Sequence, residues 1–347
     1  MSIVISLILI LFLPAPLMAS VSGPCADCHV MHASQAGISQ TARDALLNNT
    51  CLGCHTGTNN GTNTTPYVYT SGVSDLTNSL AGGNFKFAAI DDERDGHNPI
   101  ELGAVDSTLT GNPPGWASSG FAVNGQVGGG SPSWATNDLS CAGTYGCHGT
   151  HDTTGVFGTH HHHPATGAMT TADTVGNSYR FLYGIKGYED PDYEYQATSA
   201  NGQHNVYYGA ARSGSEATAD TPTNTHTISY LCAECHGVFH SGANSNQGIS
   251  DNGDIFFSNP WIRHPVDISM PLTGAYASYS YNVSAPVASD DVSNNSVNVS
   301  LAGDRIVMCL SCHRAHASPY YAGMRWNYRG SAGSWVNGCA TCHTDKS

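Results

Sequence analysis

The feature that most constrains this chain is a short pattern, Cys-x-x-Cys-His, which the sequence contains five times. The pattern is the attachment signature of c-type haem: both thiols add to the haem vinyl groups, and the histidine ligates the iron from the proximal side. The cysteine and histidine content gives roughly 0.02 matches by chance. A chain with five such sites must fold around its porphyrins. The sites are Cys25/Cys28/His29, Cys51/Cys54/His55, Cys232/Cys235/His236, Cys309/Cys312/His313 and Cys339/Cys342/His343.

A sixth site has a longer loop between its cysteines. In CAGTYGCH, five residues separate Cys141 from Cys147, and His148 follows at once. We interpret it as a haem site because its Cys-His end is intact. The alternative is a single thioether, with Cys141 free or otherwise bonded. With six sites, all twelve cysteines are used, two per haem, and the sequence predicts six covalently bound haem c groups.

Disulfides and structural zinc are the competing interpretations of twelve cysteines. An even count in an exported chain suits disulfides, and C-x-x-C pairs suit zinc ribbons. Neither interpretation explains why a histidine directly follows the second cysteine at all six sites. In the haem interpretation, that histidine is the proximal iron ligand.

The N-terminus carries an apolar run, IVISLILILFL at 3–13, which is followed by prolines and small residues. Eleven apolar residues match the hydrophobic region of a signal peptide and are too few to span a bilayer, although no Lys or Arg precedes them. We predict a signal peptide over 1–22, cleaved between about residues 19 and 22, and a single hexahaem domain over 23–347. The mature chain is then exported without a membrane span, to the cell surface or, as the alternative, to the periplasm.

The composition predicts an unusual fold. Charged residues are 11% of the chain, well below the ~25% of ordinary globular proteins, and Gly, Ser, Thr and Asn are abundant. We expect mostly ordered loop, short α and 3-10 helices around each C-x-x-C-H and very few strands, wrapped around a continuous haem chain. The formal charge of −14 argues against nucleic acid and anionic membranes as partners.

Additional histidines follow several sites at short offsets. His316 comes three residues after His313, so on a helix both rings project to one side and cannot sandwich the same iron. His316 is therefore expected to reach a neighbouring haem. The same reasoning applies to His32, His151 and His240; the alternative is that these are surface histidines.

The histidine count exceeds the demand for distal ligands. Of 18 histidines, six are proximal, which leaves twelve for six open positions. Methionine ligands are not needed, and ligation by two histidines implies lower potentials than Met/His ligation.

Several stretches resemble one known family. CADCHVMHAS, DGHNPI, CHGTH, CAECHGVFHSG, RHPVD and CLSCHRAHAS are similar to corresponding stretches of the OmcS-type outer-surface hexahaem cytochromes, which polymerise into extracellular conducting filaments (cytochrome nanowires). The resemblance covers all six sites in order; the long loop of the third site and the Tyr-rich segment 177–208 depart from it. It implies distal iron ligation by His32, His97, His151, His240, His264 and His316.

The resemblance also implies a partner. His32 would cross to an identical subunit, head to tail, and ligate the haem held there by Cys309, Cys312 and His313. The other implied partners are further cytochromes and extracellular electron acceptors.

Some polar residues stay outside this scheme. His204 is a reserve distal ligand, His226 is expected to cap or pack, and the tract 160–163 (HHHH) is expected to be a solvated loop. The acidic stretches 91–95 and 250–255 could bind calcium, although polar turns are the simpler interpretation.

The sequence is compatible with three functions. The first is long-range electron transfer through six closely packed bis-histidine haems in a filament. The second is a soluble periplasmic electron carrier. The third is a multihaem reductase, which needs an open haem face, often marked by a lysine in place of the proximal histidine. None of the three lysines follows a second cysteine, so we expect an electron-transfer protein and not an enzyme.

Overall fold

The structure is a computed structural model, and it describes part of the chain in detail. The described ranges are 50–88, 95–103, 113–114, 139–143, 145–150, 167–195, 204–211, 225–236, 264, 266–329 and 338–344, together with four short strands at 34–35, 38–39, 247–249 and 255–257. The predicted signal peptide and its cleavage region lie outside these residues, so the domain boundaries stay predictions.

Loop dominates the described chain, as the composition predicts. Two α-helices have defined bounds there, α1 (Ile228–Cys235) and α2 (Cys309–Cys312), and residues 86–88 and 338–340 are also helical. Single 3-10 turns are η2 (Cys51–Gly53), η5 (Ile100–Leu102), η7 (Val175–Asn177), η8 (Tyr179–Phe181), η12 (Gly274–Tyr276), η13 (Ala302–Asp304) and η14 (Tyr321–Gly323).

Strands contribute little to the described chain, as predicted, because each has only two or three residues. β5, β6 and β7 form an antiparallel three-stranded sheet in which Gly187 pairs with both Met169 and Tyr207. The other pairs are β1–β2, β3–β4, β8–β9 and β10–β11, of which β3–β4 is parallel. The bounds are β1 Ser34–Gln35, β2 Ile38–Ser39, β3 Ser140–Ala142, β4 Gly146–His148, β5 Ala168–Met169, β6 Gly187–Tyr188, β7 Val206–Tyr207, β8 Gln247–Ile249, β9 Ile255–Phe257, β10 Ile268–Ser269 and β11 Ile306–Val307.

Apolar side chains gather in small clusters and not in one large core. The largest surrounds β5–β7, α1 and α2, and Cys147 of the third predicted haem site packs against it. A second cluster, around Val287 and Val307, packs against Cys342 of the sixth site. A third contains Phe87, Ala88 and Ala317. Attachment cysteines therefore lie at the edges of the first two apolar clusters.

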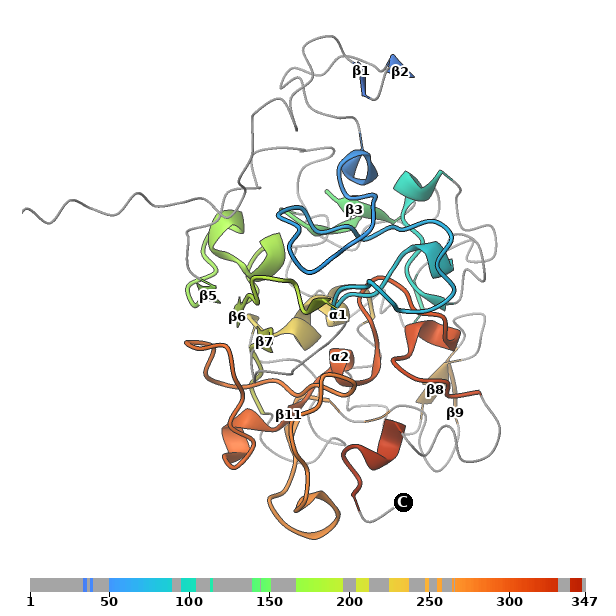
Figure 1. The fold of residues 1–347 in the computed structure, drawn as a ribbon. Coiled ribbons are helices and arrows are strands. Elements are labelled where there is room, and N and C mark those ends of the chain that lie inside the picture. The colour runs from blue at the N-terminus through green and yellow to red at the C-terminus, as the bar shows by residue number, and fades with distance from the viewer. Residues whose placement is uncertain are drawn as a thin grey trace, which may run out of the picture.

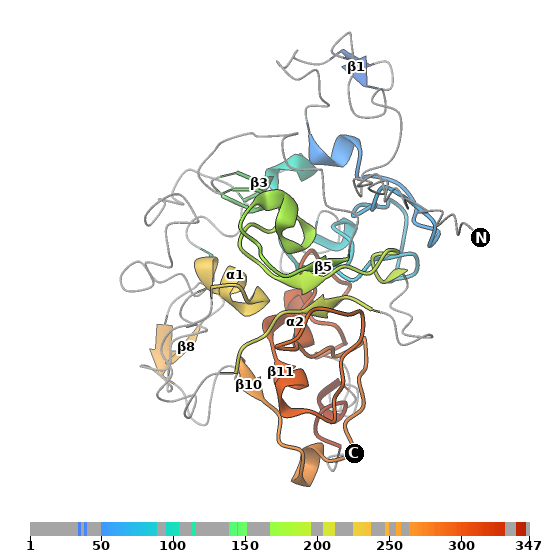
Figure 2. The same cartoon turned by 90° about the vertical axis from the view of Figure 1, so that its left-hand side faces the viewer.

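The chain progresses from one end of the molecule to the other. In both views the blue segment with η2 lies in the upper part, and the orange and red C-terminal segments lie mainly in the lower part (Figures 1 and 2). The helices α1 and α2 contact each other near the middle. Within the described residues, no helix has both the length and the apolar character needed to cross a bilayer.

Candidate haem sites

The four regularly spaced attachment sites that the structure describes lie on helical turns. Cys51 opens η2, whose first turn is capped by the Thr50 hydroxyl accepting the Gly53 N–H at 3.1 Å. The fourth and fifth sites lie within α1 and α2, and residues 338–340 at the sixth are helical. A helical turn projects residues i and i+3 to one side, so both thiols face the same space. The predicted helices are confirmed at these four sites.

At the second site the helix is shorter than the attachment motif. The 3-10 turn η2 ends at Gly53, and Cys54 is its C-cap residue, just outside the helix. Its backbone stays in the right-handed helical region, with φ of −108° and ψ of −29°. The N–H groups of Cys54 and His55 both donate to the Cys51 carbonyl, at 3.1 and 3.0 Å. These hydrogen bonds keep Cys54 one turn from Cys51, because they close the turn that η2 begins.

The third site, whose longer loop departs from the C-x-x-C-H spacing, is built differently. Cys141 lies in β3 and Cys147 in β4, on the two sides of a tight turn. A Cβ at Gly146 would lie 2.4 Å from Ala142 Cα, so only glycine permits this close approach of the two strands. The five-residue loop folds into a strand pair because it is too long for one helical turn.

Four proximal histidines share one hydrogen-bonding arrangement. In each, Nδ1 contacts a backbone carbonyl oxygen, which fixes the ring, so Nε2 is the nitrogen that would bind a metal. The pairs are His55 with Pro66 at 2.8 Å, His148 with Arg180 at 2.9 Å, His236 with Pro114 at 2.5 Å and His313 with Ala322 at 2.9 Å.

Three pairs of imidazole rings meet across long stretches of sequence. Each joins a predicted proximal ligand to a predicted distal ligand, and the ring centroids are 6.0, 6.5 and 6.2 Å apart. Two rings bound through nitrogen at about 2.0 Å to opposite sides of one metal have centroids about 6.4 Å apart, because the nitrogen lies about 1.2 Å from the ring centre. The pairs are His236 with His97, His148 with His316, and His343 with His264.

The angles between the ring planes are compatible with shared ligation. They are 41° for His97–His236, 47° for His148–His316 and 67° for His264–His343. Rotation of either ring about its nitrogen–metal bond changes this angle without moving the nitrogen. The spacing of these residues thus fits an iron with two histidine ligands.

Burial keeps two of these histidines neutral. Burial, together with the charge of nearby His97, lowers the pKa of His236 to about 4. Burial also lowers the pKa of His316 to about 3, and His148 adds to the effect. Neutral imidazole is the form that ligates iron, so both rings are ready to bind at neutral pH.

The attachment thiols form a series through the protein. Thiols of successive sites approach closely enough to perturb one another, which indicates that the second to sixth sites follow one another in space in chain order. None of the ten described cysteines, Cys54 included, forms a disulfide. The neighbouring thiols are Cys51 with Cys141, Cys147 with Cys232 and Cys235, Cys232 with Cys309, and Cys312 with Cys339 and Cys342.

Other predicted residues lie outside the pairs or outside the described chain. His204 stacks on Tyr281 with centroids 3.7 Å apart, and its Nδ1 contacts the Asn205 carbonyl at 2.8 Å, so it packs in the interior. His226 precedes Thr227, the cap of α1, and its Nδ1 contacts the Gly184 carbonyl at 2.6 Å. The residues that the structure does not describe are Cys25, Cys28, His29, His32, His151, His240, the tract 160–163 and most of 91–95 and 250–255.

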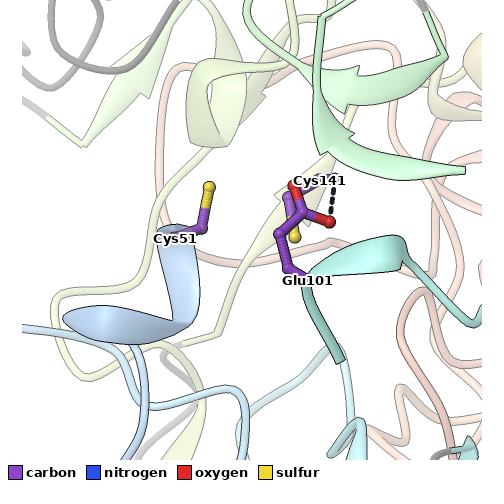
Figure 3. Close-up of side chains that lie close together, drawn as sticks. All are labelled: Cys51, Glu101 and Cys141. Carbon is purple, nitrogen blue, oxygen red and sulfur yellow. Dashed lines mark hydrogen bonds between the residues drawn. The ribbon is translucent and has the colours of Figure 1, made fainter. Parts of the chain in front are cut away.

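Sequence reasoning missed Glu101. Its carboxylate accepts the backbone N–H of Cys141, with donor–acceptor distances of 3.1 Å to Oε1 and 3.2 Å to Oε2. Oxygen of Glu101 and the thiols of Cys51 and Cys141 all lie within 4.8 Å of one another (Figure 3). The two partners are 40 residues apart, and no motif links a lone glutamate to the third site.

Comparison with known proteins gives limited similarity. No family model and no curated protein matches the chain. A solved filament of outer-membrane cytochrome S from Geobacter sulfurreducens is 22% identical, over 89% of this chain and 84% of that one, with a TM-score of 0.44. A cryo-electron microscopy structure of OmcS nanowires from Geobacter sulfurreducens is 20% identical over the same shares, with a TM-score of 0.45. These values do not establish the family.

Proposed function

We propose that this chain binds six haem c groups and transfers electrons along them. The observation that carries the proposal is the set of three imidazole pairs described above. Each pair joins the histidine of an attachment site to one far away in sequence, at the spacing that one iron requires. Surface histidines have no reason to meet attachment-site histidines three times at this distance.

Histidine side chains bind each iron from both faces. Nδ1–carbonyl contacts orient the proximal rings, and burial keeps His236 and His316 neutral and ready to bind. When bound, haem supplies an iron that gains and loses one electron. Imidazoles on both faces exclude substrate and keep the coordination unchanged between oxidation states. This arrangement favours electron transfer over catalysis at the metal.

The order of the sites supports a continuous path. Because the attachment thiols of the second to sixth sites follow one another in space, haems held there are neighbours in chain order. Close spacing lets electrons pass from site to site without a mobile carrier.

We further propose that the chain is the repeating subunit of an extracellular filament that delivers respiratory electrons to external acceptors. The motif resemblance and the apolar leader support this proposal. In it, His32 of one subunit ligates the haem at Cys309, Cys312 and His313 of the next. Such a head-to-tail contact joins two different surfaces and, if it does not close a ring, generates an open filament.

Haem content and coordination test the electron-transfer proposal. The intact mature chain should carry six haems by mass spectrometry, and its spectra should be low-spin in both oxidation states, with weak carbon monoxide binding or none. A stoichiometric high-spin haem that binds nitrite or hydroxylamine would favour the reductase instead.

Imaging of purified protein tests the filament. Filaments distinguish the conduit from the soluble periplasmic carrier, which is the second candidate. His32→Ala should leave six attached haems but no stable filaments, with one haem per subunit five-coordinate or bound to a substitute ligand. Normal His32→Ala filaments with every haem in its native state would remove the intersubunit role.

A further inference from the structure

The third site has an acceptor for its first cysteine that comes from a different segment of the chain. Both carboxylate oxygens of Glu101 receive the N–H of Cys141, and Figure 3 shows the carboxylate between η5 and β3 with the Cys51 side chain nearby. Acceptance by an ionised oxygen gives a stronger hydrogen bond than a neutral acceptor does.

The position of Glu101 is itself fixed. It is the central residue of η5, which lies between Pro99 and Gly103. Gly103 ends the turn with φ of 86°, a conformation that glycine adopts at little cost. The N–H of Ile100 donates to the carbonyl of Leu139 at 2.8 Å, which ties η5 to the start of β3. The carboxylate is therefore held beside Cys141 by backbone contacts on both sides.

The hydrogen bonds between β3 and β4 alone do not fix the position of Cys141. In β3, Ser140 and Ala142 are the residues paired with β4. Cys141 lies between them, so its N–H points away from the partner strand. At the regular sites the helical turn fixes the first cysteine, and at the fifth the N–H of Cys309 also approaches the Ser229 hydroxyl at 3.4 Å. Glu101 supplies the corresponding support at the third site.

The Cys141 thiol has the same kind of neighbour as the first cysteine of a regular site. Cys141 contacts Cys51, the first cysteine of the preceding site. Cys309 has the same relationship to Cys232, the first cysteine of the site before it. The irregular site thus reproduces the contact between the regular fourth and fifth sites.

We propose that Glu101 is the positioning residue of the third haem site, and that it holds Cys141 so that its thiol forms the second thioether across the long loop. The proposal rests on the proposed haem-binding function. In the bond-forming step the S–H adds across a haem vinyl group: a sulfur–carbon bond replaces the carbon–carbon π bond, and the hydrogen ends on the other vinyl carbon. No electron is gained or lost overall.

The three groups also allow two other outcomes. Two thiols and a carboxylate within 4.8 Å could hold a zinc ion, and the two thiols could form a disulfide. Both outcomes need Cys141 without a thioether, so peptide-level mass spectrometry of the wild-type protein distinguishes them from the proposal.

The test compares three substitutions at Glu101 in the full chain, exported with haem maturation. Glu101→Gln keeps an oxygen that accepts the N–H and should retain both thioethers. Glu101→Ala should leave the third haem attached through Cys147 alone in most molecules. Cys141 should then be open to alkylation, and one haem in six should show the red-shifted α band of a single-thioether haem. Glu101→Asp keeps the charge but is one methylene shorter, and should lose the Cys141 thioether in part; it decides the matter if Glu101→Ala does not fold.

Asp75→Ala, which removes an exposed carboxylate elsewhere, is the matched control and should keep both thioethers. Full attachment of Cys141 in Glu101→Ala, or in Glu101→Asp where only that variant folds, overturns the proposal. A Cys51–Cys141 disulfide or bound zinc in the wild type overturns it as well. If the wild-type protein lacks only the Cys141 thioether, the proposal for Glu101 fails but the haem-binding proposal stands. If the wild-type protein carries no haem at the regular sites, the haem-binding proposal itself fails.

Discussion

The rings of His316 and His148 lie with centroids 6.5 Å apart, although one follows the fifth attachment site and the other belongs to the third. Phe85 stacks on His316 at a centroid distance of 4.4 Å. A Cβ at Gly82 would lie 2.8 Å from His316 Nδ1. Packing and not a hydrogen bond orients this ring, because its Nδ1 is buried with no hydrogen-bond partner among the described residues. In the proposed function, His316 is therefore the distal ligand of the third haem and not of the fifth.

The His316→Ala substitution should therefore remove the distal ligand of the third haem. We expect six attached haems, of which one becomes high-spin and binds carbon monoxide stoichiometrically, while five stay low-spin. Optical and electron paramagnetic resonance spectra measure this. His204→Phe is the control, because it removes the ring nitrogens of a reserve ligand but can keep the stacking on Tyr281. It should leave all six haems low-spin, and a high-spin haem there would make His204 a ligand.

A double substitution tests whether two distal histidines serve different irons. His97 pairs with His236, and His316 pairs with His148. His97→Ala combined with His316→Ala should bind two equivalents of carbon monoxide per subunit, where each single variant binds one. One equivalent in the double variant would mean that both histidines serve the same haem.

Gly146→Ala tests the strand pair of the third site. The added Cβ would lie 2.4 Å from the Ala142 Cα, so β3 and β4 must separate and Cys147 must move. We expect the mass of the intact protein to show five haems in most molecules. Gly72→Ala is the control, because its Cβ would meet nothing within 4 Å. Because Gly72 has a φ of 78°, the Gly72→Ala substitution should lower the free energy of unfolding by about 1 kcal/mol. The variant should keep six haems.

Glu194 predicts a pH dependence of stability. Its Oε2 accepts the Asn205 amide at 2.9 Å, and its Oε1 is buried without a hydrogen-bond partner among the described residues. Burial raises the pKa of Glu194 to about 7 from its ordinary 4.5, with a smaller opposing effect of Arg325. The folded state then holds the proton more tightly than the unfolded chain. Glu194 therefore contributes on the order of 3 kcal/mol to the free energy of unfolding below pH 4.5, and this contribution is lost as pH rises to about 7.

Glu194→Gln should remove this slope, because the neutral amide does not titrate and can still accept from Asn205. Urea midpoints of both proteins between pH 4.5 and 8 measure it. The other carboxylates contribute equally to the two curves, so the difference isolates residue 194. The variant should be the more stable protein at pH 8, and parallel curves would contradict the assignment.

Spacing in the sequence was sufficient wherever one local element fixes the geometry. Cys309 and Cys312 are three residues apart, and a helical turn brings their thiols to one face without further information. At the third site the five-residue loop departs from this spacing, so the same reasoning predicted no local geometry there, and the structure has a strand pair. The expectation that His316 serves a neighbouring site rested on a helical face shared with His313, and this premise is wrong: α2 ends at Cys312, and His313 is extended, with φ of −109° and ψ of 157°. The meeting of His316 with His148 comes from the packing of distant loops.

The number of candidate haem sites, the thiols and histidines that form them, and the abundance of candidate distal histidines can all be read from the amino-acid sequence. These properties depend on residues within a few positions of one another. Four contacts could be found only in the folded protein: His97 with His236, His316 with His148, His264 with His343, and Glu101 with Cys141. Each of these contacts joins loops that are distant in the chain, and the packing of those loops around one another, not the spacing of residues along the chain, sets which side chains meet.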